Sequence, residues 1–184
     1  MKKIVCLIAV MLLIAPAAHA MDIDAGTVEV AGAANIGYTT TDWEFENGAT
    51  TDQSMWGVNL NSNYYFMPNF AAGLILEYTD REVDNLQSKL LQIGPALVYN
   101  FSMNEMVSIP VFGAITYATN ETENVADYSG WGWKVGAGVK YFMIDNVSLN
   151  GMIDYGQQYL EDDMELDIDG FSVKAGLSVY FGGM

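Results

Sequence analysis

The sequence contains a single cysteine and a single histidine, Cys6 and His19, and both lie in its first 20 residues. This start has the layout of a secretory signal peptide, because Lys2 and Lys3 precede an apolar run and Ala18-His19-Ala20 supplies small residues before a cleavage site. The apolar run, residues 4–14, is shorter than the roughly 20 residues that a membrane-spanning helix needs. We therefore expect residues 1–20 to be removed. Residues 21–184 then have no disulfide, no thiolate nucleophile and no imidazole.

Positive charge is also scarce. The chain has 7 Lys and Arg against 23 Asp and Glu, and the expected cleavage removes two of the basic residues. So acidic a balance argues against nucleic acid and anionic lipid headgroups as direct partners. Residues 21–184 also lack a Pro- or Ser-rich linker and any run of 18 apolar residues. We expect one domain without a transmembrane helix.

What the chain does have is a repeated alternation of large apolar residues with small or polar ones. In the stretch 135–141, for example, Val135, Val139 and Tyr141 share one parity, whereas Gly136 and Lys140 share the other. A period of two predicts strands, and helical periodicity is weak throughout. We predict eight strands, approximately Thr27–Thr39, Ser54–Phe66, Phe70–Tyr78, Lys89–Phe101, Met106–Tyr117, Gly130–Phe142, Val147–Gly156 and Phe171–Phe181.

The connections between these strands alternate in length. Short ones ("MPN", "SMNE", "MIDN") alternate with long polar ones ("TDWEFENGATTDQ", "TDREVDNLQS", "ATNETENVADYS", "QQYLEDDMELDIDG"). This asymmetry is typical of up-and-down outer-membrane barrels, which have short periplasmic turns and long external loops. We therefore predict an all-β, eight-stranded antiparallel transmembrane barrel with its termini in the periplasm and its long loops outside.

Two further patterns favour a membrane barrel over a soluble β-sandwich or lipocalin-like barrel. Aromatic residues cluster at both ends of the predicted strands, as the interfacial girdles of a membrane barrel require. The polar face is made of small and amide residues, such as Gly57, Asn59, Asn61 and Asn63. A water-facing surface would be rich in Lys and Glu, whereas a narrow lumen needs side chains that fit and bond one another.

The segments "GAGVKYFMIDNVSLNGMIDYG", "IGPALVYNF" and "FSVKAGLSVYF" resemble the outer-membrane β-barrel domain of the OmpA, OmpX and opacity-protein type. The resemblance spans nearly all of residues 21–184. It implies a barrel in the outer membrane of a Gram-negative bacterium, surrounded by lipid and lipopolysaccharide, and we expect the barrel to be a monomer. It also implies insertion by the barrel-assembly machinery, which recognises a last strand that ends in an aromatic residue. In this chain Phe181 is followed by Gly182-Gly183-Met184, so the signal is displaced from the end of the sequence.

Three functions remain open at this point. The first is a non-enzymatic barrel that acts in envelope structure or in surface interaction. The second is a narrow porin-like channel or small-ligand conduit. The third is a lipid-A-modifying enzyme, but the barrels of this kind that the chain most resembles use His with Ser. Because residues 21–184 contain no His, we expect no enzymatic activity, and we expect no cofactor.

Acidic residues are concentrated in the long connections. The last of these contains Glu161, Asp162, Asp163, Glu165, Asp167 and Asp169. One interpretation is a solvated hydrophilic rim. The other is binding of divalent cations, since alternating carboxylates and the "DIDG" sequence echo an oxygen-ligand loop, although the full calcium-loop spacing is missing.

If the apolar parity faces lipid, six charged residues face the lumen: Glu29, Glu77, Asp154, Lys134, Lys140 and Lys174. Three acids meet three bases, so we predict that ion pairs close the lumen. Strand counting places Lys134 near Asp154 across the hairpin about Ile144-Asp145, with Glu77 and Lys174 at a similar height. It places Lys140 opposite Glu29 close to the periplasmic turns.

The parity of the apolar residues changes before the last strand. Leu160, Met164, Leu166 and Ile168 are even-numbered, whereas the apolar face from Phe171 onward is odd. A β-bulge at Asp169-Gly170 would produce such a change. We accordingly predict that the last hairpin continues above the membrane as a short ribbon whose exposed edge could accept a partner strand.

Overall fold

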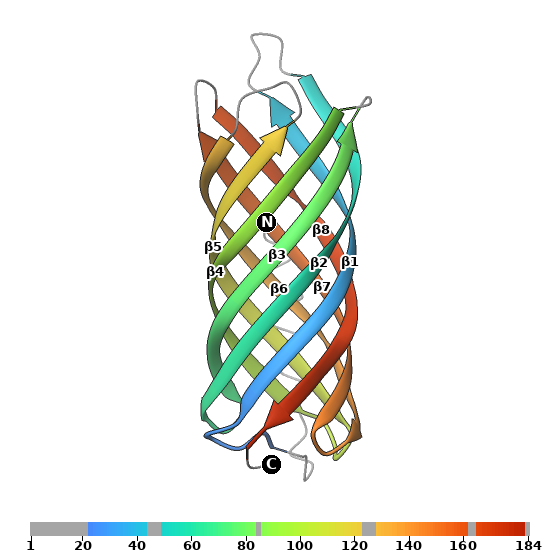
Figure 1. The fold of residues 1–184 in the computed structure, drawn as a ribbon. Helices are drawn as coiled ribbons and strands as arrows, with labels where there is room; N and C mark the ends of the chain where they lie inside the picture. Colours follow the sequence, from blue (N-terminus) through green and yellow to red (C-terminus); the bar gives the residue numbers. More distant parts are fainter. Residues whose placement is uncertain (1–21, 44–48, 84–85, 123–127, 162–164, 183–184) are drawn as a thin grey trace, which may run out of the picture.

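The computed structural model describes residues 22–43, 49–83, 86–122, 128–161 and 165–182. These residues form eight strands (Figure 1). Their bounds are β1 Val28–Trp43, β2 Ala49–Met67, β3 Phe70–Val83, β4 Leu86–Ser102, β5 Val107–Thr122, β6 Tyr128–Ile144, β7 Val147–Glu161 and β8 Glu165–Phe181. No helix that could span a membrane occurs among them.

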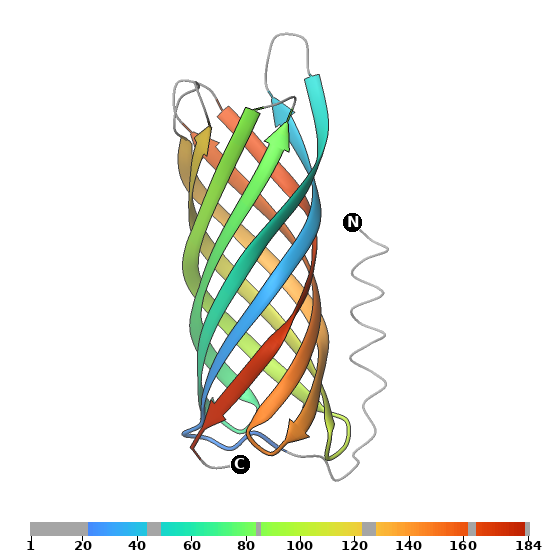
Figure 2. The same ribbon diagram turned by 45° about the vertical axis from the view of Figure 1, so that its right-hand side comes forward.

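The strands close into one antiparallel barrel in which each strand pairs with its sequence neighbour and β8 pairs with β1. Starting at Val28 of β1, one can move from each residue to its paired residue on the next strand until the path returns to β1. The path returns at Tyr38, so the register is staggered by 10 residues around the barrel. Such a stagger requires strongly tilted strands, of the order of 35–45° in barrels of this kind. Figures 1 and 2 show this tilt from two sides. The predicted fold class is confirmed.

The strands are longer than predicted, because they continue into segments that we expected to be loops. The first long connection, expected over residues 41–53, is largely strand: β1 ends at Trp43 and β2 begins at Ala49. β5 and β8 likewise extend to Thr122 and from Glu165. The error has a physical cause. Apolar alternation marks only the part of a strand that faces lipid, whereas a strand in water needs no apolar outer face.

The outer surface carries the expected apolar band with an aromatic level at each end. Near the end that holds the short turns, which we call the lower end as in Figure 1, the rings of Phe66, Phe70, Tyr99 and Phe101 contact one another edge to face or tilted. Near the upper end, Trp131 packs on Tyr117, and Tyr155 lies between Trp133 and Phe171. Rings at two levels suit the two interfaces of a bilayer.

The predicted bulge at Asp169-Gly170 is wrong. The register of β8 with β7 and with β1 runs without a shift from Glu165 to Val179 and from Leu166 to Phe181, respectively. Both edges of the last strand are therefore paired, and no free ribbon edge exists there. The register shifts of the described strands lie instead beside two of the short turns, at Tyr65/Met67 and Phe142/Ile144.

The parity change has another origin, which is an inversion of polarity along the barrel. Ile168 and Leu160 keep the inward parity of their strands and are buried, at 3% and 0% exposure. They pack inside the barrel with Leu90, Ala118 and Tyr128. Above the upper aromatic level these apolar side chains pack inside the barrel beside buried polar ones such as Asn120 and Gln158. Below that level the outer face is apolar, and the inside holds the six charged residues together with further apolar side chains.

Candidate functional site: the charged lumen

Each of the six charged residues that were predicted to face the lumen is buried. Glu29 and Glu77 are 1% exposed, and Asp154, Lys134, Lys140 and Lys174 are 3–7% exposed. Because strand side chains alternate, neighbours such as Val139 and Val173 point outward and are about half exposed. The six residues form two groups at different heights, which we call the lower and upper ion-pair layers.

The lower ion-pair layer is built around Glu29 of β1. Its carboxylate lies 2.6 Å from Lys140 Nζ of β6, the partner that the sequence predicted. It also accepts hydrogen bonds from Tyr65 Oη at 2.7 Å and Ser178 Oγ at 2.6 Å. Longer bonds come from Tyr180 Oη and Asn63 Nδ2, at 3.2 and 3.3 Å. Five donors from three strands (β2, β6 and β8) therefore meet on one buried carboxylate.

The upper ion-pair layer is built around Glu77 of β3. Oε2 of Glu77 lies 2.9 Å from Lys134 Nζ and 2.8 Å from Lys174 Nζ, and Oε1 accepts from Asn35 Nδ2 at 2.8 Å. Lys174 also reaches Asp154 Oδ2 at 3.0 Å. Lys174 thus joins two carboxylates, and Glu77 joins two ammonium groups.

The expected pairing of Lys134 with Asp154 is not observed. The residue of β7 opposite Lys134 is Gly156, whereas Asp154 lies opposite Gly136. A Cβ on Gly156 would lie 2.7 Å from Cγ of Lys134, so the lysine stem occupies the space above this glycine. Because no side chain stands there, Lys134 can cross the lumen and reach Glu77.

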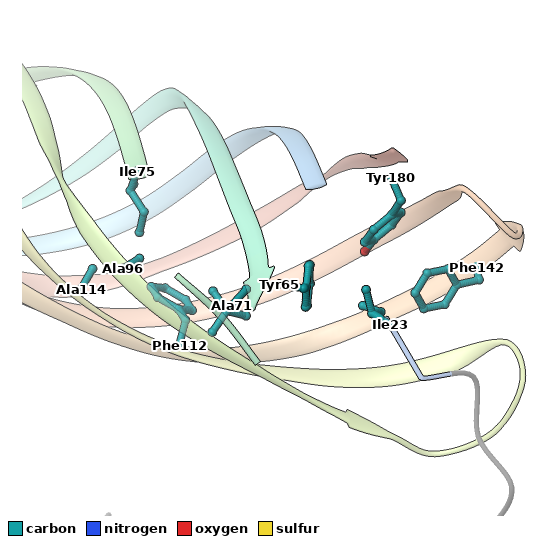
Figure 3. Close-up of a cluster of buried hydrophobic side chains, with 10 residues drawn as sticks. Ile23, Tyr65, Ala71, Ile75, Ala96, Phe112, Ala114, Phe142 and Tyr180 are labelled. Carbon is teal, nitrogen blue, oxygen red and sulfur yellow. The ribbon is translucent and has the colours of Figure 1, made fainter. Parts of the chain in front are cut away.

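An apolar belt separates the two layers. Ile75, Ala96 and Phe112 belong to the consecutive strands β3, β4 and β5, are buried, and lie near one another on one side of the lumen (Figure 3). They border a cavity of about 50 Å³ that Lys140 and Lys174 also line. A second cavity of about 40 Å³ lies above Glu77, beneath Leu90 and Ile168.

The lower end is covered by a segment that the sequence did not reveal. Ile23, which precedes β1, is 1% exposed and packs among Tyr65, Phe142 and Tyr180 (Figure 3). Its backbone N–H donates to Asn69 Oδ1 at 2.9 Å, and the Asn69 N–H donates to the carbonyl oxygen of Ile23 at 2.9 Å. Only an isolated apolar residue between two aspartates marks this segment, which is too weak a pattern to predict a plug.

The backbone conformation of Asn69 suits this contact. It has a φ of 61°, in the left-handed region that asparagine tolerates better than most residues. Its amide nitrogen also donates to Asp22 Oδ1 at 2.6 Å, and Ser102 Oγ donates to the same oxygen at 3.1 Å. The segment 22–26 is therefore held to two of the short turns by side chains as well as by backbone.

The predicted acidic loop is placed only in part. Asp162 and Asp163 lie outside the described residues, and Glu161, Glu165 and Asp167 are described only as strand backbone. Asp169 is on the outer face of β8, where it accepts a hydrogen bond from Tyr155 Oη at 2.8 Å. No cluster of three metal-ligating side chains occurs in the part of the chain that the structure describes. Cation binding at this loop stays a prediction.

A closed eight-stranded barrel with an apolar outer band, two aromatic levels and a charged interior defines a bacterial outer-membrane β-barrel. The sequence agrees, because the family model "Outer membrane protein beta-barrel domain" matches residues 6–181. The chain belongs to this family, and its location is the bacterial outer membrane. The resemblance to barrels of the OmpA and OmpX type is confirmed. A comparison with the sequences of curated proteins finds no significant match.

Solved structures with the same fold include several outer-membrane proteins. Neisserial surface protein A superposes with a TM-score of 0.61 at 16% identity, over 83% of this chain and 97% of that chain. OprG from Pseudomonas aeruginosa gives 0.57 at 13% identity, over 87% and 98%. The outer membrane enzyme PagL gives 0.54 at 16% identity, over 79% and 97%. At these identities the likeness concerns the fold.

Proposed function

We propose that the protein is a closed, non-enzymatic barrel that acts in envelope structure or in surface interaction, and that it conducts neither ions nor small solutes. The observation that carries this proposal is the pair of buried ion-pair layers. Through ion pairs and hydrogen bonds, each layer joins side chains from at least three strands across the lumen. A solute would have to break both layers in order to pass.

The apolar contacts at the two ends support the same conclusion. Ile23 and the rings around it obstruct the lower end, and Leu90, Tyr128, Leu160 and Ile168 pack together near the upper end. The cavities between them, about 50 and 40 Å³, have room for a few water molecules at roughly 10–15 Å³ each. Neither cavity could hold a sugar or an amino acid.

The energetics of the ion pairs also favour a closed lumen. Removal of one partner of a buried pair typically costs about 3–5 kcal/mol, because the remaining charge has no counter-ion. Opening the lumen would separate the pairs of both layers while water entered to solvate them. Thermal fluctuations would therefore open such a lumen only rarely.

The enzymatic alternative has a structural neighbour in PagL, an outer membrane enzyme. Against it stands the composition of this chain, since its single histidine and single cysteine are His19 and Cys6, both in the expected signal peptide. The buried acids of the lumen are also held by lysines or hydroxyl groups, away from any lipid acyl chain. General acid–base chemistry on a lipid needs a group that reaches the outer face of the barrel.

A deletion strain complemented with the native gene would test the proposal. We expect the deletion strain to be more sensitive to detergents than the complemented strain. We expect its lipid A mass spectrum and its uptake of small hydrophilic solutes to be unchanged. A shift of lipid A mass that complementation reverses would instead indicate an enzyme. A fall in solute uptake that complementation reverses would indicate a channel.

A further inference from the structure

The first six residues of β2 are paired on one side only. Ala49–Ser54 pair with Tyr38–Trp43 of β1, but the register of β2 with β3 begins only at Met55, opposite Arg81. Within the described part of the chain, no strand pairs with the other side of Ala49–Ser54. The start of β2 accordingly rises above the tip of β3 in both views of the barrel (Figures 1 and 2). We call this unpaired side the free edge of β2.

The free edge presents backbone groups that a further strand could bind. In an antiparallel pair, alternate residues direct their N–H and C=O groups to the same neighbour, so about three of the six residues bond to β1 and about three face away from it. The edge also lacks common forms of protection, because Ala49–Ser54 contains no Lys and no Pro and has no bulge in its register with β1. Such an edge is a template for an added strand.

The charge around the free edge restricts which segment would fit there. The strand segments that surround it are the upper ends of β1, β2 and β3, and they contain four acids and one base: Asp42, Asp52, Asp80, Glu82 and Arg81. Opposite charges on neighbouring strands stabilise a pair, and like charges destabilise it. A segment that carries Lys or Arg therefore fits this edge better than an acidic one.

A second copy of the barrel fits the edge poorly. Two copies side by side in one membrane are normally related by a two-fold axis, which must lie along the membrane normal. Because barrel strands tilt by about 35–45° from the barrel axis, the two β2 strands would cross at about 70–90°, twice the tilt. Strands that cross at this angle cannot form a ladder. Two copies would also bring like charges together.

We propose that the free edge of β2 binds an extended segment of another protein that carries Lys or Arg, and that this segment adds a strand to the barrel wall. The edge lies at the end of the long connections, which we expect to face the cell exterior. The proposal rests on the surface-interaction part of the proposed function and names the kind of partner. It does not depend on the closed lumen, because the edge lies above both ion-pair layers.

Amide hydrogen exchange of the barrel, residues 21–184, in lipid nanodiscs would test the edge. In the free barrel the exchange rates of Ala49–Ser54 should alternate along the strand, with the edge-facing amides at least about tenfold faster than those bonded to β1. The probe is a synthetic peptide that alternates Lys with Val and Thr. Its addition should slow exchange of the fast amides at least about tenfold.

Matched probes and variants separate strand pairing from charge attraction. The same peptide N-methylated at every residue lacks the donors of a ladder and should give no protection, and a peptide with Glu in place of Lys should bind more weakly at low salt. Asp52→Lys should weaken binding of the Lys peptide at least about threefold. Asp145→Lys, a matched change in the short turn between β6 and β7 at the lower end, should leave it unchanged.

Four results would overturn the site. Uniform exchange along Ala49–Ser54 in the free barrel would mean that no free edge exists, since the strand is then unpaired or covered on both sides. Protection that rises with barrel concentration would mean that a second copy binds there. Absence of protection at millimolar Lys peptide, or equal protection by the N-methylated peptide, would mean that no strand is added. The proposed function fails through different readouts, the lipid A mass and the solute uptake of the deletion strain.

Discussion

The Lys140–Glu29 pair of the lower layer should contribute a measurable coupling energy to stability. Its two charged atoms are 2.6 Å apart, and neither residue pairs with any other charged side chain among the described residues. Lys140→Met removes the ammonium group and keeps most of the stem. Glu29 then retains only neutral donors, such as Tyr65 and Ser178. We expect this change to lower the free energy of unfolding by about 3–5 kcal/mol.

The reverse change, Glu29→Gln, should cost a similar amount, because it leaves the Lys140 ammonium without a counter-ion. The double variant removes both charges. It should therefore be more stable than the sum of the single effects predicts, by about 2–3 kcal/mol, which is near the upper end of coupling energies between contacting residues. Coupling of this size is expected only when the two charges act on each other directly.

Urea unfolding in lipid vesicles, followed by tryptophan fluorescence, would measure all four proteins of the cycle. Trp131 and Trp133 lie near the upper end and report on the folded barrel. Val139→Met is a matched control, since Val139 precedes Lys140 on β6 and faces lipid at 49% exposure. The reasoning is refuted if the effects of Lys140→Met and Glu29→Gln add to within about 0.5 kcal/mol.

Three further predictions concern the remaining contacts of the lumen. In the same urea assay, the coupling energy between Lys134→Met and Glu77→Gln should be at least about 1 kcal/mol, and that between Lys134→Met and Asp154→Asn should be less than about 0.5 kcal/mol. The opposite ranking would show that Lys134 pairs with Asp154, as expected from sequence. Gly156→Ala should lower the free energy of unfolding by about 1–3 kcal/mol, because the added methyl group displaces Lys134. The control Gly151→Ala, where a Cβ has open space, should change the free energy of unfolding little. Equal losses in the two variants would contradict this account. In a background without cysteine, the thiol of the Ala71→Cys variant should not react with a water-soluble maleimide, and it should become reactive when Ile23→Ser is added. The gel mobility of the labelled protein would measure the reaction. Equal labelling of the two variants would mean that Ile23 does not seal the lower end.

Much of the fold could be predicted from the sequence because two environments impose opposite demands on alternate residues. Lipid requires an apolar outer face and a narrow lumen requires small or polar side chains, so the parity of a strand is visible wherever it crosses the bilayer. The short turns and the aromatic levels gave the number and direction of the strands. Above the membrane this contrast disappears, and there the predicted strand ends and the predicted bulge were wrong.

The candidate site shows the same limit. Parity identified which charged residues point inward, and strand counting brought Lys140 opposite Glu29. The partner of Lys134 could not be predicted by counting, because it depends on the direction that a long side chain takes across the lumen. That direction is set by the bare backbone of Gly156, which the sequence displays without revealing its role. The Ile23 plug lies outside the alternating segments and so had no periodic pattern to identify it.

Current through the purified barrel in a planar lipid bilayer tests the closed lumen most directly. The account predicts no steady conductance above that of the lipid alone, at any voltage that the bilayer withstands, for the unmodified protein and for the lipid-facing control Val139→Met. It also predicts that channels appear only after both ion-pair layers have been removed by substitution. Ohmic steps of uniform size from the unmodified barrel would contradict the account.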